Sequence, residues 1–82
     1  MRIIKFALQT GMNAREGFNL KLKYMEYQDH ILCGWFLEQG DENSTYEVYV
    51  ALTGEEVPDE YRYVCTTQTT FSGGYYVLHA YD

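Results

Sequence analysis

The chain of 82 residues has few basic residues, one proline, two cysteines and no long apolar run. Six lysines and arginines against twelve aspartates and glutamates give a net charge of -6. Duplex DNA or RNA is held by a basic face that displaces counterions, so this charge balance excludes such a partner. It disfavours an anionic membrane surface for the same reason. The longest apolar run, Ile31–Leu37, is far shorter than the roughly 20 residues that span a bilayer.

The first residues, Met1–Lys5, are not typical of a secretory signal, because their apolar run ends after two residues where such a signal needs roughly 7–15. We therefore expect a cytoplasmic protein, in which Cys33 and Cys65 stay reduced. The two cysteines lie far apart and match no zinc-binding spacing. We expect them to be small buried hydrophobic residues, and we expect neither a metal nor a cofactor.

Length and composition indicate a single domain over residues 1–82. Hydrophobic residues make up 46% and charged residues 22%, which is ordinary for a globular protein and argues against disorder. A chain of this size buries only about 60% of its unfolded surface. Because such a core is thin, association with further copies would stabilise it.

β-Branched and aromatic residues dominate between clusters of glycine, asparagine, aspartate and serine, a pattern typical of short strands separated by turns. No segment shows helical periodicity over three turns. The predicted fold is all-β, a small antiparallel sandwich or open barrel of about six strands. The expected strands are Ile3–Gln9, Phe18–Tyr27, Ile31–Glu38, Thr45–Leu52, Tyr61–Thr69 and Tyr75–Tyr81.

The segments between these strands predict their connections. Thr10–Gly17, which contains two glycines, is expected to be a loop, with Asn13–Gly17 as the only candidate for a helical turn. Gln28–His30 is short enough to close a hairpin. Thr70–Gly74, with two glycines free to take positive φ, should join the last two strands. Gly34 lies inside an apolar strand, which suggests a bulge or a close approach by a neighbouring group.

Residues for catalysis are scarce. The only formal nucleophile and base are Cys33 with His30 or His79, and an extended chain holds Cys33 about 10 Å from His30. Glu55 and Glu56 imitate a carboxylate pair, but neighbouring side chains in a loop usually point apart. We therefore expect a protein that is not an enzyme.

Aromatic residues are abundant instead. Nine tyrosines, four phenylalanines and one tryptophan make up 17% of the chain, more than a small core can enclose. Surplus tyrosines tend to lie at interfaces and ligand sites. Three interpretations remain open: cross-strand packing within one subunit, a homo-oligomer interface, and stacking on a ligand. The faces concerned are Tyr61, Tyr63 and Cys65 on one strand and Tyr75, Val77, His79 and Tyr81 on the next.

Five motifs occur in a fixed order: Cys33–Glu38, Thr53–Gly54, Val57–Pro58, Tyr63–Gln68 and Val77–Asp82. In this order they resemble small bacteriophage proteins, mostly without assigned function. Those proteins carry a Cys-Leu-Trp-Ala-Leu-Val segment, a Gly-Thr-Gly-His loop leading to Ile-Pro, a Tyr-Ile-Gly-Thr-x-Gln strand and a closing His-Val-Phe-Glu. The resemblance implies an early-expressed phage accessory protein that acts in the host cytosol, and by analogy one that counters host defence.

The first functional hypothesis is binding and sequestration of a small cyclic nucleotide signal at sites between subunits of a homo-oligomer. Aromatic rings would stack on the bases, and arginines would hold the phosphates. Arg15 lies in the glycine-flanked segment expected to fold over a ligand. The other expected ligand-binding residues are Arg62, Thr66, Gln68, Thr69, Thr70 and Tyr75.

Two further hypotheses remain open. An acidic face could block the basic nucleic-acid channel of a host defence nuclease, provided that two acidic loops lie at the same end of the sheet. Alternatively, the chain is a structural virion or assembly protein that uses its aromatic residues as oligomer interfaces. The acidic residues in question are Glu38, Asp41, Glu42, Glu55, Glu56, Asp59 and Glu60.

Overall fold

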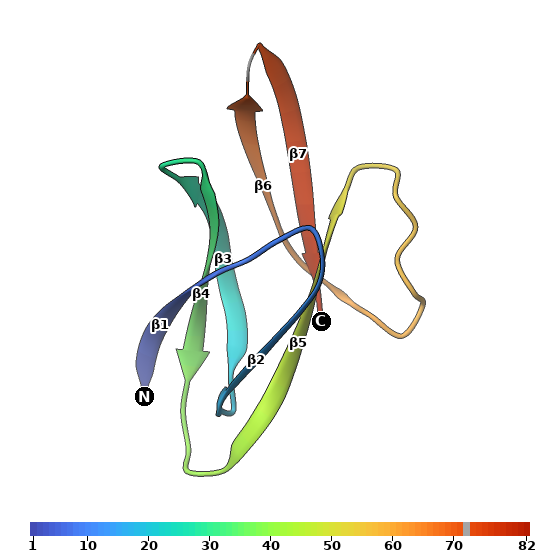
Figure 1. Ribbon diagram of the computed structural model, residues 1–82. Coiled ribbons are helices and arrows are strands. Elements are labelled where there is room, and N and C mark those ends of the chain that lie inside the picture. The colour runs from blue at the N-terminus through green and yellow to red at the C-terminus, as the bar shows by residue number, and fades with distance from the viewer. Residues whose placement is uncertain (72) are drawn as a thin grey trace.

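The computed structural model describes residues 1–71 and 73–82, with residue 71 described by its backbone alone. These residues form seven strands and no helix (Figure 1). No helix in the described ranges is therefore long and apolar enough to cross a membrane. The strands are β1 (Arg2–Ala7), β2 (Gly11–Phe18), β3 (Lys21–Gln28), β4 (Ile31–Glu38), β5 (Asn43–Leu52), β6 (Tyr63–Phe71) and β7 (Gly74–Tyr81).

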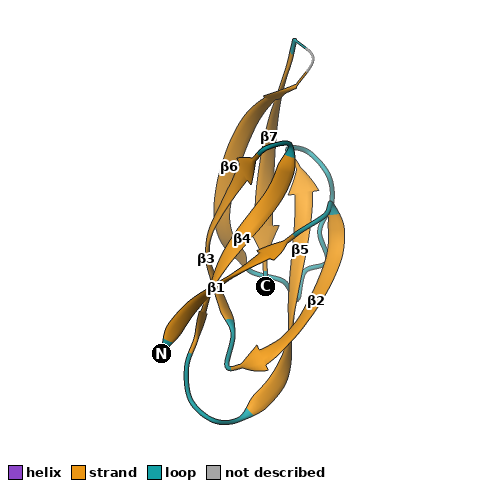
Figure 2. Ribbon diagram, turned by 60° about the vertical axis from the view of Figure 1, so that its left-hand side comes forward, coloured by secondary structure: helices purple, strands orange, loops and turns teal. Residues whose placement is uncertain are grey.

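The seven strands form two antiparallel sheets, which pack against each other as a small sandwich (Figure 2). One sheet has the order β1-β4-β3 and the other the order β2-β5-β7-β6. The all-β prediction is confirmed, with seven strands in place of six. Large side chains less than 2% exposed fill the space between the sheets: Leu22, Met25, Phe36, Val48, Val50 and Leu78.

The prediction of a loop over Thr10–Gly17 is wrong, because this segment holds strand β2, which pairs with β5 from Gly11 to Phe18. The strand lacks an apolar alternation because its inward positions are polar or small. Asn13 is one of them, only 3% exposed. Its side-chain amide accepts a hydrogen bond from the Gln9 N–H at 2.9 Å and donates to the Gln9 carbonyl at 2.8 Å. These bonds satisfy a buried polar group that apolar patterning does not reveal.

The predicted strand Phe18–Tyr27 is not continuous. Its first residue belongs to β2 and the rest lies largely in β3, whose register with β4 shifts part-way along. Asn19, with φ of 48°, separates β2 from β3. A β-bulge between Leu22 and Tyr24 then changes the register with β4. Because a bulge inserts one extra residue, it reverses the alternation of the side chains that follow. Tyr24 is therefore 53% exposed, and Met25 takes the core position.

Three expectations, about two connections and Gly34, are confirmed. Asp29 and His30 both have positive φ, as the central residues of a tight type I′ hairpin turn require. β4 is the central strand of its sheet. A Cβ atom on Gly34 would lie 2.8 Å from the Leu8 side chain, so the glycine permits a close approach. β6 and β7 form a hairpin as expected, although Ser72 in its turn lies outside the described residues.

Candidate functional site

Most of the predicted ligand-binding residues of β6 and β7 share the outer face of the four-stranded sheet. Thr70 lies directly opposite Tyr75 in the register of the two strands. Thr66 and Gln68 follow on the same face, because alternate residues of a strand point to the same side. Thr69 points to the other side and lines a hollow of about 250 Å³ at one end of the space between the sheets. The structure therefore brings four of the seven predicted residues onto one surface.

The two predicted arginines lie on different elements. Arg15 is on the edge strand β2, where its guanidinium donates hydrogen bonds to the carbonyls of Ala14 at 2.8 Å and Ala7 at 2.7 Å. It also lies 5.9 Å from the centre of the Phe6 ring. Arg15 therefore fastens β2 to the end of β1, and it does not occupy a loop over a ligand. Arg62 precedes β6 and is exposed.

A row of aromatic side chains, here called the tyrosine face, crosses the outer side of the four-stranded sheet. Tyr49 of β5 lies opposite Tyr81 of β7, which lies opposite Tyr63 of β6. The Tyr63 and Tyr81 ring centroids are 6.0 Å apart. Tyr61, from the preceding loop, contacts Tyr49 with ring centroids 5.6 Å apart. A bulge between Tyr63 and Cys65 turns Cys65 to the inner side, so the predicted face of Tyr61, Tyr63 and Cys65 keeps only its two tyrosines.

A chain of hydrogen bonds runs beside the tyrosine face. The two ring nitrogens of His79 lie 2.7 Å from the Thr53 hydroxyl and 2.9 Å from the Thr66 hydroxyl. The Thr66 hydroxyl is in turn 2.7 Å from the Tyr63 hydroxyl. His79 is therefore a packed histidine whose partners are hydroxyl groups. Both of its ring nitrogens are within hydrogen-bond distance of a threonine hydroxyl, and the tautomer decides which one donates.

The two cysteines are free thiols. Cys33 is buried, and its thiol donates to the Ile31 carbonyl at 3.7 Å. Cys65 is half-buried, and this burial raises the pKa of its thiol. Since the thiolate is the reactive form, the environment of Cys65 disfavours reaction. Among residues 1–71 and 73–82, no three His, Cys, Asp or Glu side chains form a group suited to a metal ion.

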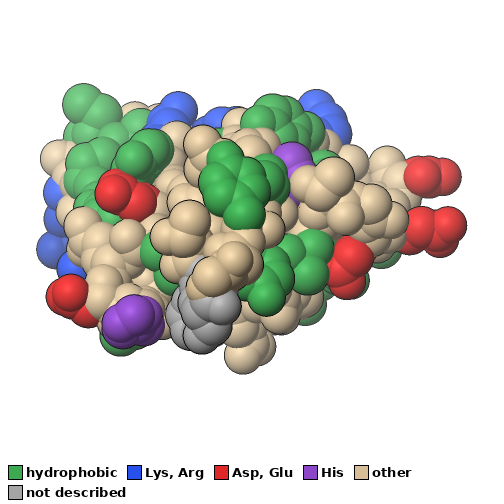
Figure 3. Space-filling view, turned by 90° about the horizontal axis from the view of Figure 1, so that it is seen from above, with side chains coloured by type: hydrophobic (Ala, Val, Ile, Leu, Met, Phe, Trp, Pro, Cys, Tyr) green, Lys and Arg blue, Asp and Glu red, His purple; other side chains and the backbone are tan. Residues whose placement is uncertain are grey.

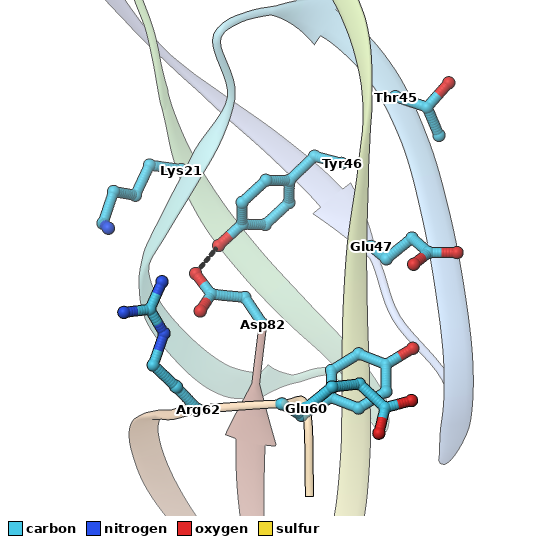
Figure 4. Close-up of a pocket in the computed structure, with 8 residues that line it drawn as sticks. Lys21, Thr45, Tyr46, Glu47, Glu60, Arg62 and Asp82 are labelled. Carbon is cyan, nitrogen blue, oxygen red and sulfur yellow. Dashed lines mark hydrogen bonds between the residues drawn. The ribbon is translucent and has the colours of Figure 1, made fainter. Parts of the chain in front are cut away.

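A hollow of about 570 Å³ adjoins the tyrosine face (Figure 4). Lys21 and Arg62 lie on one side of it, and Glu47 and Glu60 lie on the other. Between them the Tyr46 hydroxyl donates a hydrogen bond to the Asp82 carboxylate. The hollow is open to solvent and has carboxylates as well as cations in its wall. It therefore does not present a purely cationic surface to an anion.

The electrostatic surroundings of Tyr61 show how acidic this region is. Partial burial raises the pKa of the Tyr61 hydroxyl, and the nearby carboxylates of Glu47 and Glu60 raise it further. The two predicted acidic loops, however, lie at opposite ends of β5. Asp41 and Glu42 precede that strand, and the loop that contains Glu55 follows it. The acidic residues therefore do not gather at one end of the sheet.

The outer side of the three-stranded sheet carries a second aromatic surface, here called the tryptophan face. In the registers of β1, β4 and β3, Lys5 lies opposite Trp35, and Trp35 lies opposite Tyr24. The two rings are 5.5 Å apart between centroids, and the Lys5 ammonium is 6.0 Å from the centre of the Trp35 ring. The neighbouring row across the same face is Ile3, Leu37 and Lys21.

Basic residues are concentrated in the three-stranded sheet. Arg2, Lys5, Lys21 and Lys23 are four of the six basic residues of the chain, and all lie in β1 or β3. Only two of the twelve acidic residues, Glu26 and Glu38, belong to the strands of this sheet. A chain that is acidic as a whole therefore has one sheet with an excess of cations.

Comparisons with known proteins identify the family of the chain. A family model described as "Domain of unknown function (DUF7352)" matches residues 1–82. The chain belongs to this family. Comparison with curated proteins and with solved structures gave no match. Membership of this family is thus what the comparisons establish.

The sequence-based interpretation of this family member missed the tryptophan face. Two signals pointed to it: the single tryptophan of the chain, and Lys21 and Lys23 alternating with Leu22. The position of Tyr24 beside Trp35 could not be predicted from the sequence pattern. A strict alternation from Leu22 places Tyr24 in the core, and only the bulge brings it out.

Proposed function

We propose that the protein binds a small phosphorylated nucleotide on the tryptophan face and holds it without converting it. The observation that supports this proposal is the row Lys5, Trp35 and Tyr24, which combines aromatic rings with cations. Cyclic di- and trinucleotides are the proposed ligand class. Following the resemblance to phage proteins, we propose that the protein sequesters such a signal from the host during infection.

The aromatic rings supply the surface for the base. Tyr24 is 53% exposed, and Trp35 is partly exposed. Stacking of a base on an aromatic side chain contributes roughly 1–3 kcal/mol and is tolerant of base identity. The Tyr24 hydroxyl donates to the Glu26 carboxylate at 3.0 Å. This hydrogen bond holds the Tyr24 ring in place and engages its hydroxyl, so the ring offers a base its aromatic surface.

The cations supply contacts for phosphate. Lys5, Lys21 and Lys23 are all exposed, and lysine binds phosphate as a point charge. Lys21 lies both on the tryptophan face and at the rim of the hollow that holds Arg62. The cations thus continue round the edge of the sheet, from the tryptophan face to one of the arginines predicted from the sequence.

The shape of the face bears on how a ligand would be covered. Small-molecule sites are usually concave and cover most of the ligand, whereas the tryptophan face is one side of an open sheet. A single chain would leave a stacked nucleotide partly in water. We therefore propose that the enclosed site forms between two copies of the chain.

Two matched tyrosine variants test the location of the site. Tyr24 and Tyr63 are exposed to 53% and 60%, and each contacts one aromatic ring and one neighbouring oxygen. In calorimetric titrations with cyclic di- and trinucleotides of adenine and guanine, Tyr24→Leu should weaken binding about tenfold or more, and Tyr63→Leu should leave it unchanged.

The outcomes of these titrations are distinct. Absence of heat with every nucleotide, at tens of micromolar wild-type protein, rejects nucleotide binding as the function. Loss of binding in Tyr63→Leu with retention in Tyr24→Leu moves the site to the tyrosine face. Inhibition of a host nuclease by an acidic patch has weaker support, because the acidic loops lie at opposite ends of β5.

A further inference from the structure

The end of the β6–β7 hairpin projects beyond the rest of the molecule (Figures 1 and 2). Pairing between β5 and β7 ends where Leu52 lies opposite Leu78. From Gly74 to Val77, β7 therefore pairs only with β6 among the described residues. β6 is itself the outermost strand of its sheet. We call this projecting part, Gln68–Phe71 and Gly73–Val77, the arm.

The strand edges of the arm are unpaired among the described residues, and Thr70 and Tyr75 on its outer face are exposed. On the inner face, Thr69 and Tyr76 line a hollow together with Tyr27 of β3. Each edge presents backbone N–H and C=O groups that a further strand can pair with. Tyr75 and Tyr76 point to opposite faces and are 64% and 45% exposed. A two-stranded hairpin is only marginally stable in water by itself. The arm would therefore be stabilised by contact with another chain.

The arm lies within a long segment that has no charged residue. Residues 63–81 contain no aspartate, glutamate, lysine or arginine, although the chain has 18 such residues. Seen from the end of the arm, the acidic side chains in view lie mostly toward the margins of the molecule (Figure 3). A basic protein or a nucleic acid would find no charged group to bind on this segment.

We propose that the arm docks on the arm of a second copy of this chain, edge to edge and antiparallel. Two molecules of net charge -6 repel each other wherever acidic surfaces meet, and an uncharged segment avoids this repulsion. A two-fold contact also needs a surface that complements itself. A free strand edge meets that requirement, because it carries donors and acceptors in alternation.

Charge variants of two exposed threonines test the proposal. Thr70 lies on the arm, and Thr45 lies near the start of β5 opposite Glu16, outside the arm. By sedimentation equilibrium, wild type should dimerise. Thr70→Lys should weaken the dimer at least about tenfold through like-charge repulsion, and Thr45→Lys should leave it unchanged. An equimolar mixture of Thr70→Lys and Thr70→Glu should dimerise more tightly than either variant alone.

A wild-type chain that remains monomeric up to about 1 mM overturns the proposal, as does equal weakening by Thr70→Lys and Thr45→Lys. Hydrogen exchange gives a second measurement that does not need a variant. The amides along the docking edge, residues 68–70 of β6 or residues 74–77 of β7, should exchange more slowly as the wild-type concentration rises through the dimer constant. Unchanged rates along both edges contradict docking by the arm. The inference does not depend on the proposed ligand, since none of these measurements uses a nucleotide.

Discussion

Tyr24 of β3 lies directly opposite Trp35 of β4, with ring centroids 5.5 Å apart and ring planes inclined by 50°. The bulge before Tyr24 creates this pair, because it turns the tyrosine away from the core. Lys5 completes the row on the far side of Trp35. This side of the three-stranded sheet thus combines ring surface with positive charge in a chain that is acidic as a whole.

The fluorescence of Trp35 should report ligand binding directly, because the chain has one tryptophan. A base stacked on the ring should quench its emission, and the midpoint of quenching should match the calorimetric dissociation constant. A nucleotide that binds by calorimetry but leaves the emission unchanged would show that the ligand lies elsewhere.

Protonation of the Glu38 carboxylate, which is only 6% exposed, should lower the stability of the fold at acidic pH. The Phe18 N–H, which donates to its carboxylate at 3.0 Å, and Arg2, at 2.6 Å, hold the pKa of Glu38 below its usual value. A lowered folded-state pKa stabilises the fold above the unfolded value of about 4.3. This stabilisation is lost as the pH falls through the folded pKa.

Urea denaturation of wild type and Glu38→Gln at neutral pH and near pH 3 measures this contribution. The variant should be less stable at neutral pH and should lose less stability on acidification. Glu42→Gln, which removes a carboxylate from an exposed position, serves as the control and should follow wild type. Parallel pH dependence of Glu38→Gln and wild type would disprove the role of Glu38.

Tyr46 should limit stability in alkali. Burial raises the pKa of its hydroxyl, and the hydrogen bond to Asp82 raises it further by a smaller amount. The folded state thus favours the neutral phenol, so stability is full below the unfolded pKa of about 10 and declines as the pH rises above it. Tyr46→Phe also leaves the Leu22 N–H without its acceptor at 3.2 Å.

The expected cost of Tyr46→Phe at neutral pH is about 1–3 kcal/mol, measured by urea denaturation. The variant should lose less stability than wild type between pH 9 and pH 11, about one unit on either side of the ordinary tyrosine pKa. Equal alkaline losses in the two proteins would show that Tyr46 does not govern this range.

Gly34→Ala should destabilise the fold by about 1–3 kcal/mol, as overpacking of a filled core does. The added Cβ atom would lie 2.8 Å from the Leu8 side chain and 2.9 Å from the Phe36 ring. Leu8→Val shortens one of these neighbours, so the double variant should lose less stability than the sum of the two single changes. Strict additivity would mean that Leu8 does not cause the clash.

The sequence predicted the elements whose pattern follows from burial alone. β4 has the predicted bounds, Ile31–Glu38, because a central strand is apolar on both faces. Tyr46, Val48 and Val50 alternate along β5, whose predicted bounds are Thr45–Leu52, and Val48 and Val50 are fully buried. In these segments local patterning and tertiary packing agree.

The sequence did not predict elements whose stability depends on polar groups or on irregular backbone. Strand β2 was missed because Asn13 and Gly17 hold inward positions that apolar residues usually fill. No characteristic residue type marks the bulge that exposes Tyr24, because the bulge is a property of the pairing with β4. The tryptophan face depends on that bulge, so the sequence pattern did not reveal it. The sequence predicted site residues at Arg15, Arg62 and on the β6–β7 hairpin instead.

We propose that the protein holds a nucleotide and leaves it chemically unchanged, and the bound molecule itself can be examined. Purified protein is incubated with the cyclic nucleotide that binds most tightly, the protein is denatured, and the released molecule is identified by mass spectrometry. Binding without conversion predicts that the intact nucleotide is recovered in an amount equal to that bound. A linearised or hydrolysed product that increases with time would show instead that the protein converts its ligand.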